Sequence, residues 1–316
     1  MTRVTLLAGG VGGAKLAEGL AEIPEITLTV IGNVADDEEF HGLWVSPDID
    51  TMLYTLSDRV NRDQGWGLAD EGNRALEMLN CLGADTWMFL GDRDFGLHIY
   101  RTERLRRGDR PSDILADIVS KFDINSKILL PTEAKVQTRV FTDCGWLSFQ
   151  EYFVKERCKP DVLELRYDGL ESSKITPHAE QALKEAELIV IAPSNPLVSI
   201  LPILKIPGFY TALQETTAYI LAVSPLISGK ALKGPADRML TSLKYRADSV
   251  GVAHFYEDIA GYFLMDCSDR DLSGEVSKLG MTPYTTDILM PDLAGKVRLA
   301  HEILAIYKNE SRMDSK

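Results

Sequence analysis

The feature that most constrains the fold is a glycine-rich turn placed directly after a short apolar run. Residues 4–8 are apolar except for Thr5, and Gly9-Gly10-Val11-Gly12-Gly13 and a helical pattern over residues 14–21 follow them. A short, continuously apolar run is typical of a strand buried on both faces of a parallel sheet. A strand, a glycine turn and a helix in that order predict the first unit of an open α/β sheet.

Later apolar runs continue this alternation. They cover residues 26–31, 87–90, 188–192 and 219–223. A helical stripe at spacings of three and four follows at residues 292–307, which is typical of a helix packed on a core. Short apolar runs that alternate with helices predict an α/β fold with a Rossmann-like, doubly wound and mostly parallel sheet.

The middle of the chain has a different pattern. Residues 136–141 and 146–149 flank a glycine-containing turn and predict a hairpin, and a further strand is predicted at 162–167. We therefore expect a single domain over residues 1–316, with an insertion subdomain at about residues 95–185 on the Rossmann-like core.

Charge and cysteine content exclude several classes of function. The chain carries 34 Lys and Arg against 47 Asp and Glu, a net charge of −13. Nucleic-acid phosphates and anionic membrane surfaces attract basic faces, so neither is expected as a partner. No apolar run approaches the roughly 18 residues that span a bilayer. The four cysteines form no CxxC pair, which argues against zinc or a disulfide framework and favours a cytoplasmic protein.

The glycine turn is a candidate anion site. Glycines let an anion approach the N–H groups at a helix N-terminus, where the helix dipole favours negative charge. The turn is not a P-loop, because Ala14 precedes Lys15, and it lacks the third glycine of the dinucleotide fingerprint. The alternative is a turn that needs glycines only to pack a helix on a strand. The candidate phosphate contacts here are Gly10, Gly12, Gly13 and Lys15.

An acidic stretch after the second strand is a candidate cation site. Asn33 and the acids at 36–39 are followed by Ser46-Pro47-Asp48-Ile49-Asp50. If this segment is extended, Asp48 and Asp50 point the same way and can hold a hard divalent cation. Alternatively, residues 36–39 form a solvated acidic loop, and Asp48 or Asp50-Thr51 caps a helix that runs through Leu56.

Further polar turns follow the other apolar runs. Asp92 and Arg93 come after residues 87–90, and either contact a substrate or form a surface ion pair. Ser194, Asn195 and Ser199 follow the fourth run, while Ser224 and Lys233 follow the fifth; they either donate hydrogen bonds to phosphate or form ordinary turns. The aromatic run at residues 149–153 offers a stacking surface or belongs to the core. Together the turns predict one shared cleft.

Six segments in combination resemble one known family. They read GGVGGAKL, NVADDEEFHGLWVSPDIDT, LGDRD, FQEYFV, APSNPLVSI and AVSPLISGKALKGPA, within a match from Gly9 to at least Asp269. The chain is similar to the CofD family, the 2-phospho-L-lactate transferases of deazaflavin coenzyme biosynthesis.

The resemblance implies a magnesium-dependent group transfer. Such enzymes pass a phospholactyl or related unit from a guanosine-diphosphate-activated C3 acid to the ribityl hydroxyl of Fo (7,8-didemethyl-8-hydroxy-5-deazariboflavin). GMP leaves, and the reaction belongs to coenzyme F-420 biosynthesis. The resemblance also implies a Rossmann-like fold and a homodimer.

On this chain the resemblance gives each candidate residue a role. Asp50 and Arg93, with Asp92, would contact Fo, and Asp48 with Asp50 would hold Mg²⁺. Asp48 or Asp50 would also accept the hydroxyl proton as the catalytic base. The nucleotide would be bound by residues of the turns: Gly10, Gly12, Gly13, Lys15, Asn33, Ser194, Asn195, Ser224 and Lys233.

Two other functions and the choice of donor stay open. A non-catalytic member of the same superfamily would bind sugar nucleotides and regulate carbon metabolism, although Asp50, LGDRD and FQEYFV favour an Fo pocket. A nicotinamide-dependent oxidoreductase is suggested by the glycines after the first strand, and the missing third glycine argues against it. The activated acid is phospholactate, phosphoenolpyruvate or phosphoglycerate.

Overall fold

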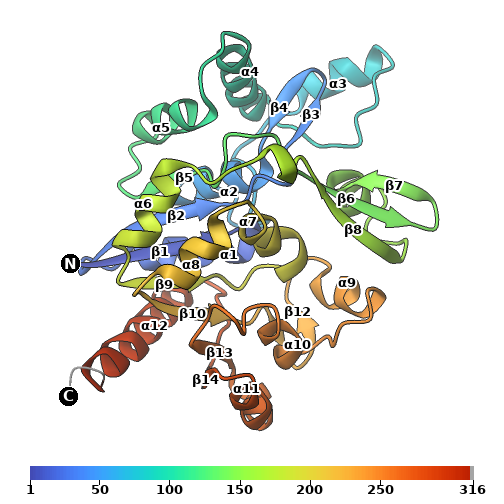
Figure 1. Ribbon diagram of the computed structural model, residues 1–316. Helices are drawn as coiled ribbons and strands as arrows, with labels where there is room; N and C mark the ends of the chain where they lie inside the picture. Colours follow the sequence, from blue (N-terminus) through green and yellow to red (C-terminus); the bar gives the residue numbers. More distant parts are fainter. Residues whose placement is uncertain (314–316) are drawn as a thin grey trace.

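The computed structural model describes residues 1–313 and is built around a seven-stranded parallel sheet (Figure 1). In spatial order the strands are β14 (Thr282–Thr286), β13 (Tyr262–Asp266), β10 (Tyr219–Val223), β9 (Leu188–Ile191), β1 (Thr2–Ala8), β2 (Ile26–Gly32) and β5 (Lys127–Leu129). Each neighbouring pair in this sheet is parallel. The predicted mostly parallel α/β sheet is confirmed.

The direction in which successive strands are added to the sheet reverses between β1 and β9. From β1 the chain continues to β2 and β5 on one side, and then returns to β9, β10, β13 and β14 on the other. This is the strand order of a Rossmann-like, doubly wound sheet, in which ligands bind beyond the carboxyl ends of the strands at the reversal point. The fold therefore directs attention to the turns that follow β1 and β9.

Helices cover both faces of the sheet. They are α1 (Gly10–Ala21), α2 (Pro47–Leu56), α3 (Arg74–Cys81), α4 (Asp92–Arg106), α5 (Pro111–Lys121), α6 (Pro177–Glu185), α7 (Leu201–Leu204), α8 (Phe209–Glu215), α9 (Ala236–Ser242), α10 (Ser249–Ala253), α11 (Ser273–Lys278) and α12 (Leu293–Met313), with short turns η1 (Glu151–Lys155), η2 (Leu170–Ser172), η3 (Pro196–Ile200) and η4 (Cys267–Leu272). Alternate side chains of β1 enter two cores: Leu6 packs with α1, α2 and α12, and Leu7 packs with α6, α8 and η3. Among residues 1–313, no single helix is long and apolar enough to cross a bilayer.

Three smaller sheets stand beside the central one. Two are short hairpins, β3 (Glu38–Phe40) with β4 (Leu43–Val45) and β11 (Leu226–Ile227) with β12 (Lys230–Ala231). The third joins β7 (Gly145–Ser148), β6 (Gln137–Thr142) and β8 (Val162–Asp168) in antiparallel order, away from the central strands in Figure 1. The predicted hairpin and the strand after it are confirmed.

The expected strand at residues 87–90 is wrong. In the described chain these residues form a loop before α4, where Trp87 packs edge-on against Phe40 in a small cluster with Leu90 and Phe95. The apolar run therefore reflects local burial rather than strand pairing. β5, which pairs with β2, is the edge strand instead, and it lies inside the stretch 95–185. Within this stretch, residues 137–168 contain the separate three-stranded sheet.

Helix α12 completes the core beneath the start of the chain. A Cβ on Gly19 of α1 would lie 2.3 Å from the carbonyl oxygen of Lys296 in α12, so only glycine allows the two backbones to approach this closely. Next to this contact, the buried Lys296 ammonium donates to the Glu18 carboxylate, at 2.5 Å. The same carboxylate accepts from Arg62, at 2.6 Å.

This contact makes Gly19→Ala unusual. Alanine normally stabilises a helix interior relative to glycine, but here the added methyl group meets the backbone of α12. We expect the free energy of unfolding to fall by about 1–3 kcal/mol. Gly96→Ala in α4 is the matched control, because nothing outside its own helix in residues 1–313 lies within 4 Å of its would-be Cβ. That change should stabilise by up to about 1 kcal/mol. Chemical denaturation measures both, and effects of the same sign would contradict the contact.

Candidate active site

The glycine turn after β1 and the turn after β9 are joined at the reversal point of the sheet. The Ser194 hydroxyl donates to the carbonyl oxygen of Gly9 at 2.7 Å, and the Gly9 N–H lies 3.4 Å from the same hydroxyl oxygen. Ser194 is buried, so this double contact is shielded from water. Two of the predicted turns therefore meet, as a shared cleft requires.

Close packing explains why this turn contains glycines. Gly10 adopts a φ of +62°, a conformation that side chains rarely tolerate. A Cβ on Gly12 would lie 2.2 Å from the carbonyl oxygen of Pro193. Because α1 begins at Gly10, the N–H groups of Val11 and Gly12 have no acceptor within the helix. This end of α1 has the backbone groups and the dipole of an anion site.

Asp48 lies directly against the glycine turn. Its Oδ2 accepts a hydrogen bond from Asn33 Nδ2 at 2.9 Å, and the same amide also reaches the carbonyl oxygen of Val198 at 3.2 Å. The Gly10 N–H donates to the Asp48 carboxylate, and a Cβ on Gly9 would lie 2.5 Å from Asp48 Oδ2. The end of β2, the first turn of α2 and the start of α1 thus meet at one carboxylate.

The expectation that Asp48 and Asp50 point the same way is wrong. Both lie in the first turn of α2, which begins at Pro47, a favoured first helical position for proline. On a helix, two residues of sequence separation turn a side chain by about 200°, so the carboxylates diverge. Neither Asp48 nor Asp50-Thr51 is the N-cap, because Ser46 occupies that position, but the predicted helix through Leu56 is confirmed.

Asp50 faces α4 and is fully engaged there. Arg101 binds Asp50 with two nitrogens: Nη2 contacts Oδ1, and Nη1 lies 3.1 Å from Oδ2. His98 Nδ1 lies 3.7 Å from Asp50 Oδ2, and burial lowers the pKa of His98 to about 4. Asp94 completes this face of α4 by accepting from the Tyr54 hydroxyl, at 2.5 Å. The spacing Asp94, His98, Arg101 is that of one helix face, which is the signal that could have revealed these residues.

Asp36 and Asp37 are buried, so the interpretation of residues 36–39 as a solvated loop is wrong for these two. They are 5% and 7% exposed, and neither Oδ1 atom has a hydrogen-bond partner within residues 1–313. The three-stranded sheet covers them: Gln137 Nε2 donates to the Asp37 carbonyl at 2.8 Å, and Gln150 Nε2 lies 3.4 Å from that of Asp36. Burial raises the pKa of Asp37 to about 8.

The buried carboxyls fit a divalent cation. Burial and the charges of Asp48 and Asp37 raise the pKa of Asp36 well above its usual range, and burial raises that of Asp48 to about 6. Asp36 and Asp48 thus interact with each other, and Asp36 Oδ1 is bare. The described residues contain no group of three or more acidic, His or Cys ligands. A cation here would take two carboxylates and fill its other positions with water or phosphate, as Mg²⁺ does.

Three basic side chains near the glycine turn donate hydrogen bonds to uncharged backbone carbonyl oxygens. Lys15 Nζ donates to the Met290 carbonyl at 2.9 Å, Lys233 Nζ to that of Gln64 at 2.7 Å, and Arg93 Nη1 to that of Ala69 at 3.2 Å. Burial and the neighbouring Lys233 lower the pKa of Lys15. The chain has 13 more acidic than basic side chains. Because these three basic side chains bind carbonyl oxygens rather than carboxylates, they are available to bind an anion.

Other predicted site residues have internal roles. Asp92 accepts from the backbone N–H of Ala75, at 3.0 Å, at the start of α3. The Ser224 hydroxyl is fully buried and lies 3.1 Å from that of Ser249 in α10. Asn195 Oδ1 accepts from the N–H of Leu197 at 2.9 Å and caps η3. The side chains of Asp92, Ser224 and Asn195 therefore stabilise local structure.

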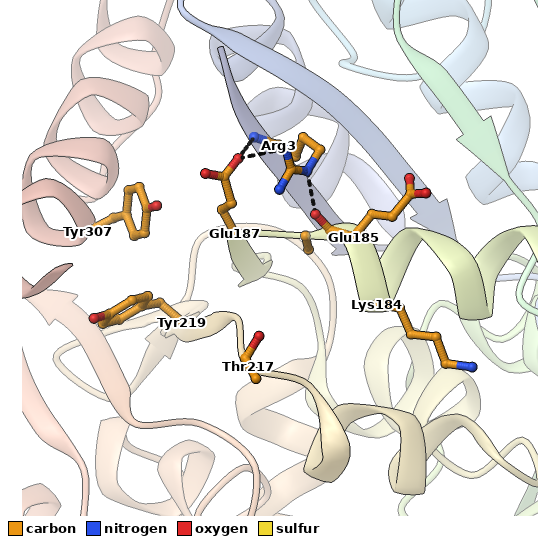
Figure 2. A pocket seen from close by; sticks show the side chains of 8 residues that line it. Arg3, Lys184, Glu185, Glu187, Thr217, Tyr219 and Tyr307 are labelled. Carbon is orange, nitrogen blue, oxygen red and sulfur yellow. Dashed lines mark hydrogen bonds and ion pairs between the residues drawn. The ribbon is translucent and has the colours of Figure 1, made fainter. Parts of the chain in front are cut away.

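A large cavity lies at the opposite end of the strands, where they begin. Its volume is about 570 Å³, and it is lined by residues from the start of β1 and β10, including Arg3, Glu187, Tyr219 and Tyr307. Figure 2 shows Arg3 turned to Glu185 and Glu187 on one side of it. Because Arg3 opens β1 while the glycine turn follows its end, this cavity is not part of the site.

The site can be compared with known proteins. A family model described as 2-phospho-L-lactate transferase CofD matches residues 4–291. A 2-phospho-L-lactate transferase of Methanopyrus kandleri is 37% identical, covering 97% of this chain and 98% of that protein. One of Methanococcoides burtonii is 34% identical over 96% and 99% of the two chains, and a phosphoenolpyruvate transferase of Streptomyces coelicolor is 33% identical over 96% and 98%.

A solved structure supports the fold independently. A member of the UPF0052 family from Bacillus halodurans superposes with a TM-score of 0.64 and covers 96% of this chain and all of its own, at 16% identity. The shared architecture, the nearly full-length relatives and the family model agree. The chain belongs to the 2-phospho-L-lactate transferase CofD family.

Proposed function

We propose that this protein transfers a phospholactyl-type group from a guanosine-diphosphate-activated C3 acid to the ribityl hydroxyl of Fo and releases GMP. The observation that carries the proposal is the meeting of the glycine turn, Asn33, Asp48 and Ser194 at the reversal point of the sheet. A diphosphate on that turn would lie beside buried carboxylates, an arrangement suited to metal-assisted phosphoryl transfer. The relatives' names support a transferase of a phosphorylated C3 acid.

The donor diphosphate would bind the free N–H groups of Val11 and Gly12. Lys15 and Lys233 would exchange their carbonyl partners for phosphate oxygens, because a charge-assisted hydrogen bond is stronger than one to a neutral acceptor. Guanosine would extend over the β9 side of the turn, towards Ser194 and Asn195. The diphosphate is thereby held without an excess of basic residues in the chain.

Mg²⁺ fits Asp36 and Asp48 better than the pair Asp48 and Asp50. Asp36 has a bare oxygen and interacts with Asp48, whereas both oxygens of Asp50 are engaged by Arg101. The bound cation would neutralise the charge of the diphosphate and polarise the reacting phosphorus. Asp50 remains a candidate contact for Fo together with Arg93, whose exposed side chain is held by one carbonyl.

The transfer balances without a further reactant. The ribityl oxygen forms a bond to the phosphorus that carries the C3 acid, and the bond from that phosphorus to the bridging oxygen breaks. GMP leaves with the bridging oxygen and its electron pair. The hydroxyl proton passes to a carboxylate; Asp48 is favoured over Asp50, since it lies at the glycine turn and is not paired with a guanidinium.

The activity itself is tested directly. Purified protein with Mg²⁺, Fo and a guanosine-activated C3 acid should yield GMP and a deazaflavin that is heavier by the phosphoacid, as seen by mass spectrometry. A competition between equimolar guanosine-activated forms of phospholactate, phosphoenolpyruvate and phosphoglycerate identifies the acid that the protein transfers. If no donor is consumed, the proposal fails; protection by a sugar nucleotide but not by Fo in a thermal shift would then identify the non-catalytic alternative.

The substitution Asp48→Asn tests whether turnover depends on Asp48 itself rather than on the general charge of the acidic segment. The amide keeps the shape of the side chain but removes its charge, so turnover should fall on the order of 100-fold or more while the melting temperature is retained. Glu39→Gln, an exposed acid in the same segment, is the matched control and should keep full activity. Steady-state kinetics compares the two, and near-normal turnover in Asp48→Asn would remove Asp48 from the site.

The buried acids also predict how stability depends on pH. Burial raises the pKa of Asp37 to about 8, so between pH 6.5 and 8 the folded metal-free protein holds a proton that the unfolded chain releases. The free energy of unfolding should fall with rising pH by about 1 kcal/mol per pH unit for each such group. His98 opposes this trend near pH 6.5, because its pKa is lowered to about 4 in the fold while the unfolded imidazole is still partly protonated; above about pH 7.5 it is neutral in both states and no longer contributes.

Thermal unfolding across this window measures the slope. Asp37→Asn should flatten it, and Mg²⁺ should stabilise the protein more at pH 8 than at pH 6.5, because it binds ionised carboxylates. Stability of the metal-free protein that rises with pH across the window would contradict the buried acid cluster.

A further inference from the structure

The first turn of α4 has no capping side chain of its own. Gly91 precedes this helix and carries no side chain, although the first N–H groups of a helix have no acceptor within it. Helix α3 begins in a similar way, because Asn73 precedes it and makes no capping hydrogen bond with its side chain. Both helix starts therefore need acceptors from elsewhere in the chain.

The two helices receive these acceptors from each other. Glu71, just before α3, accepts from the N–H of Arg93 with Oε2 at 2.9 Å and from that of Asp94 with Oε1 at 3.0 Å. In return, Asp92 Oδ1 accepts from the N–H of Ala75 in α3, at 3.0 Å. The start of α4 is thus held by a carboxylate that belongs to the segment before α3.

The two segments pack too closely for larger residues. A Cβ on Gly91 would lie 2.3 Å from the carboxyl carbon of Glu71, and a Cβ on Gly72 would lie 2.2 Å from Asp92 Oδ2. The N–H of Asp92 also donates to the carbonyl oxygen of Gly72, at 2.9 Å. Each carboxylate therefore lies where a side chain on the opposite glycine would lie.

These contacts occupy the N–H groups that an anion would need at the start of α4. The N–H groups of residues 92–94 donate to Gly72 and Glu71, and that of Gly91 lies 3.4 Å from Asp94 Oδ2. The first turn of α4 therefore does not offer a phosphate site like that of α1. What it presents to a ligand is the side chain of Arg93.

The position of Arg93 depends on Glu71. The Arg93 side chain is exposed, and its guanidinium donates to the neutral carbonyl of Ala69 at 3.2 Å. Glu71 binds the main chain of Arg93 and so fixes the point from which this side chain extends. Because a long, exposed arginine has many rotamers, the place of its backbone decides what it can reach.

We propose that Glu71 is a positioning residue for the acceptor, because it fixes the first turn of α4 so that Arg93 binds Fo. This inference rests on the proposed function, in which Arg93 contacts Fo. Glu71 acts through Arg93 and does not itself touch the substrate, since both of its oxygens are engaged. The effect is specific to the acceptor, because the groups assigned to the donor belong to α1, the turn after β9 and the segment before α9.

Glu71→Ala tests this role against a purely structural one. We expect Fo binding, measured by titration calorimetry, to weaken about fivefold or more, because two backbone hydrogen bonds are lost. The KM for Fo should rise with it, whereas kcat and GMP affinity should stay within about twofold. Asp248→Ala is the matched control, because Asp248 caps α10 by accepting from the N–H of Gly251 at 2.9 Å. Both variants should lower the melting temperature, and only Glu71→Ala should weaken Fo binding.

Gly91→Ala disturbs the same contact from the other side, because its methyl group takes the place of the Glu71 carboxyl. It should weaken Fo binding as Glu71→Ala does, and the double variant should bind Fo no more weakly than either single variant. Gly96→Ala is the control within α4, since nothing outside its own helix in residues 1–313 lies within 4 Å of its would-be Cβ. Its Fo affinity should be unchanged. Gly91→Ala decides the matter if Glu71→Ala does not fold.

The outcomes separate this role from the proposed function. Unchanged Fo affinity in Glu71→Ala and Gly91→Ala, or an equal loss of Fo and GMP affinity, would overturn the role of Glu71 and leave the transferase intact. Additive losses in the double variant would overturn it as well. A wild-type protein that binds no Fo would overturn both the role of Glu71 and the proposed function.

Discussion

The hydrogen bond from Asn33 to Asp48 is the interaction on which the rest of the site depends. Asn33 sits at the end of β2, and its amide also binds the carbonyl of Val198, so one side chain ties the central sheet to α2 and η3. Asp48 then takes the N–H of Gly10 and leaves no room for a side chain at Gly9. Without this bond a buried carboxylate would lose one of its two donors, at a cost of about 1–3 kcal/mol.

The second constraint is an excess of buried negative charge. Asp36 interacts with both Asp37 and Asp48, and the Arg101 guanidinium that faces Asp37 is already paired with Asp50. Such a cluster is unfavourable in an isolated fold, because carboxyls in a low-dielectric setting repel one another or take up protons. In the proposed reaction, a cation that compensates these carboxyls would also compensate a diphosphate, in a chain whose net charge would otherwise repel it.

The sequence predicted the fold and the meeting of the turns that follow β1 and β9, for a reason that lies in local patterns. The apolar residues 4–8 and the glycines after them specify a buried strand and a close turn wherever they occur. Contacts between distant segments carried no such signal. Residues 87–90 read as a strand because burial in a side cluster gives the same apolar run as burial in a sheet.

The acidic segment shows the same limit of sequence patterns. Asp36 and Asp37 read as solvated because the β6 strand that covers them is a hundred residues away in the chain. The pairing of Asp50 with Arg101 depends on how α2 meets α4, and the separation of Asp48 from Asp50 depends on where α2 begins. Tertiary packing decided each of these points.

The cations that rest on backbone carbonyls also bear on how products depart. Lys233 and Arg93 hold Gln64 and Ala69, both in one loop that passes Val11 of the glycine turn. In the proposed reaction Lys233 would turn to a phosphate and Arg93 to the acceptor, so the loop would lose both tethers; when the ligands leave, the carbonyls can take these side chains back. In the proposed reaction the loop would thus compete with GMP for the charge of Lys233, which would weaken product affinity and favour rapid turnover.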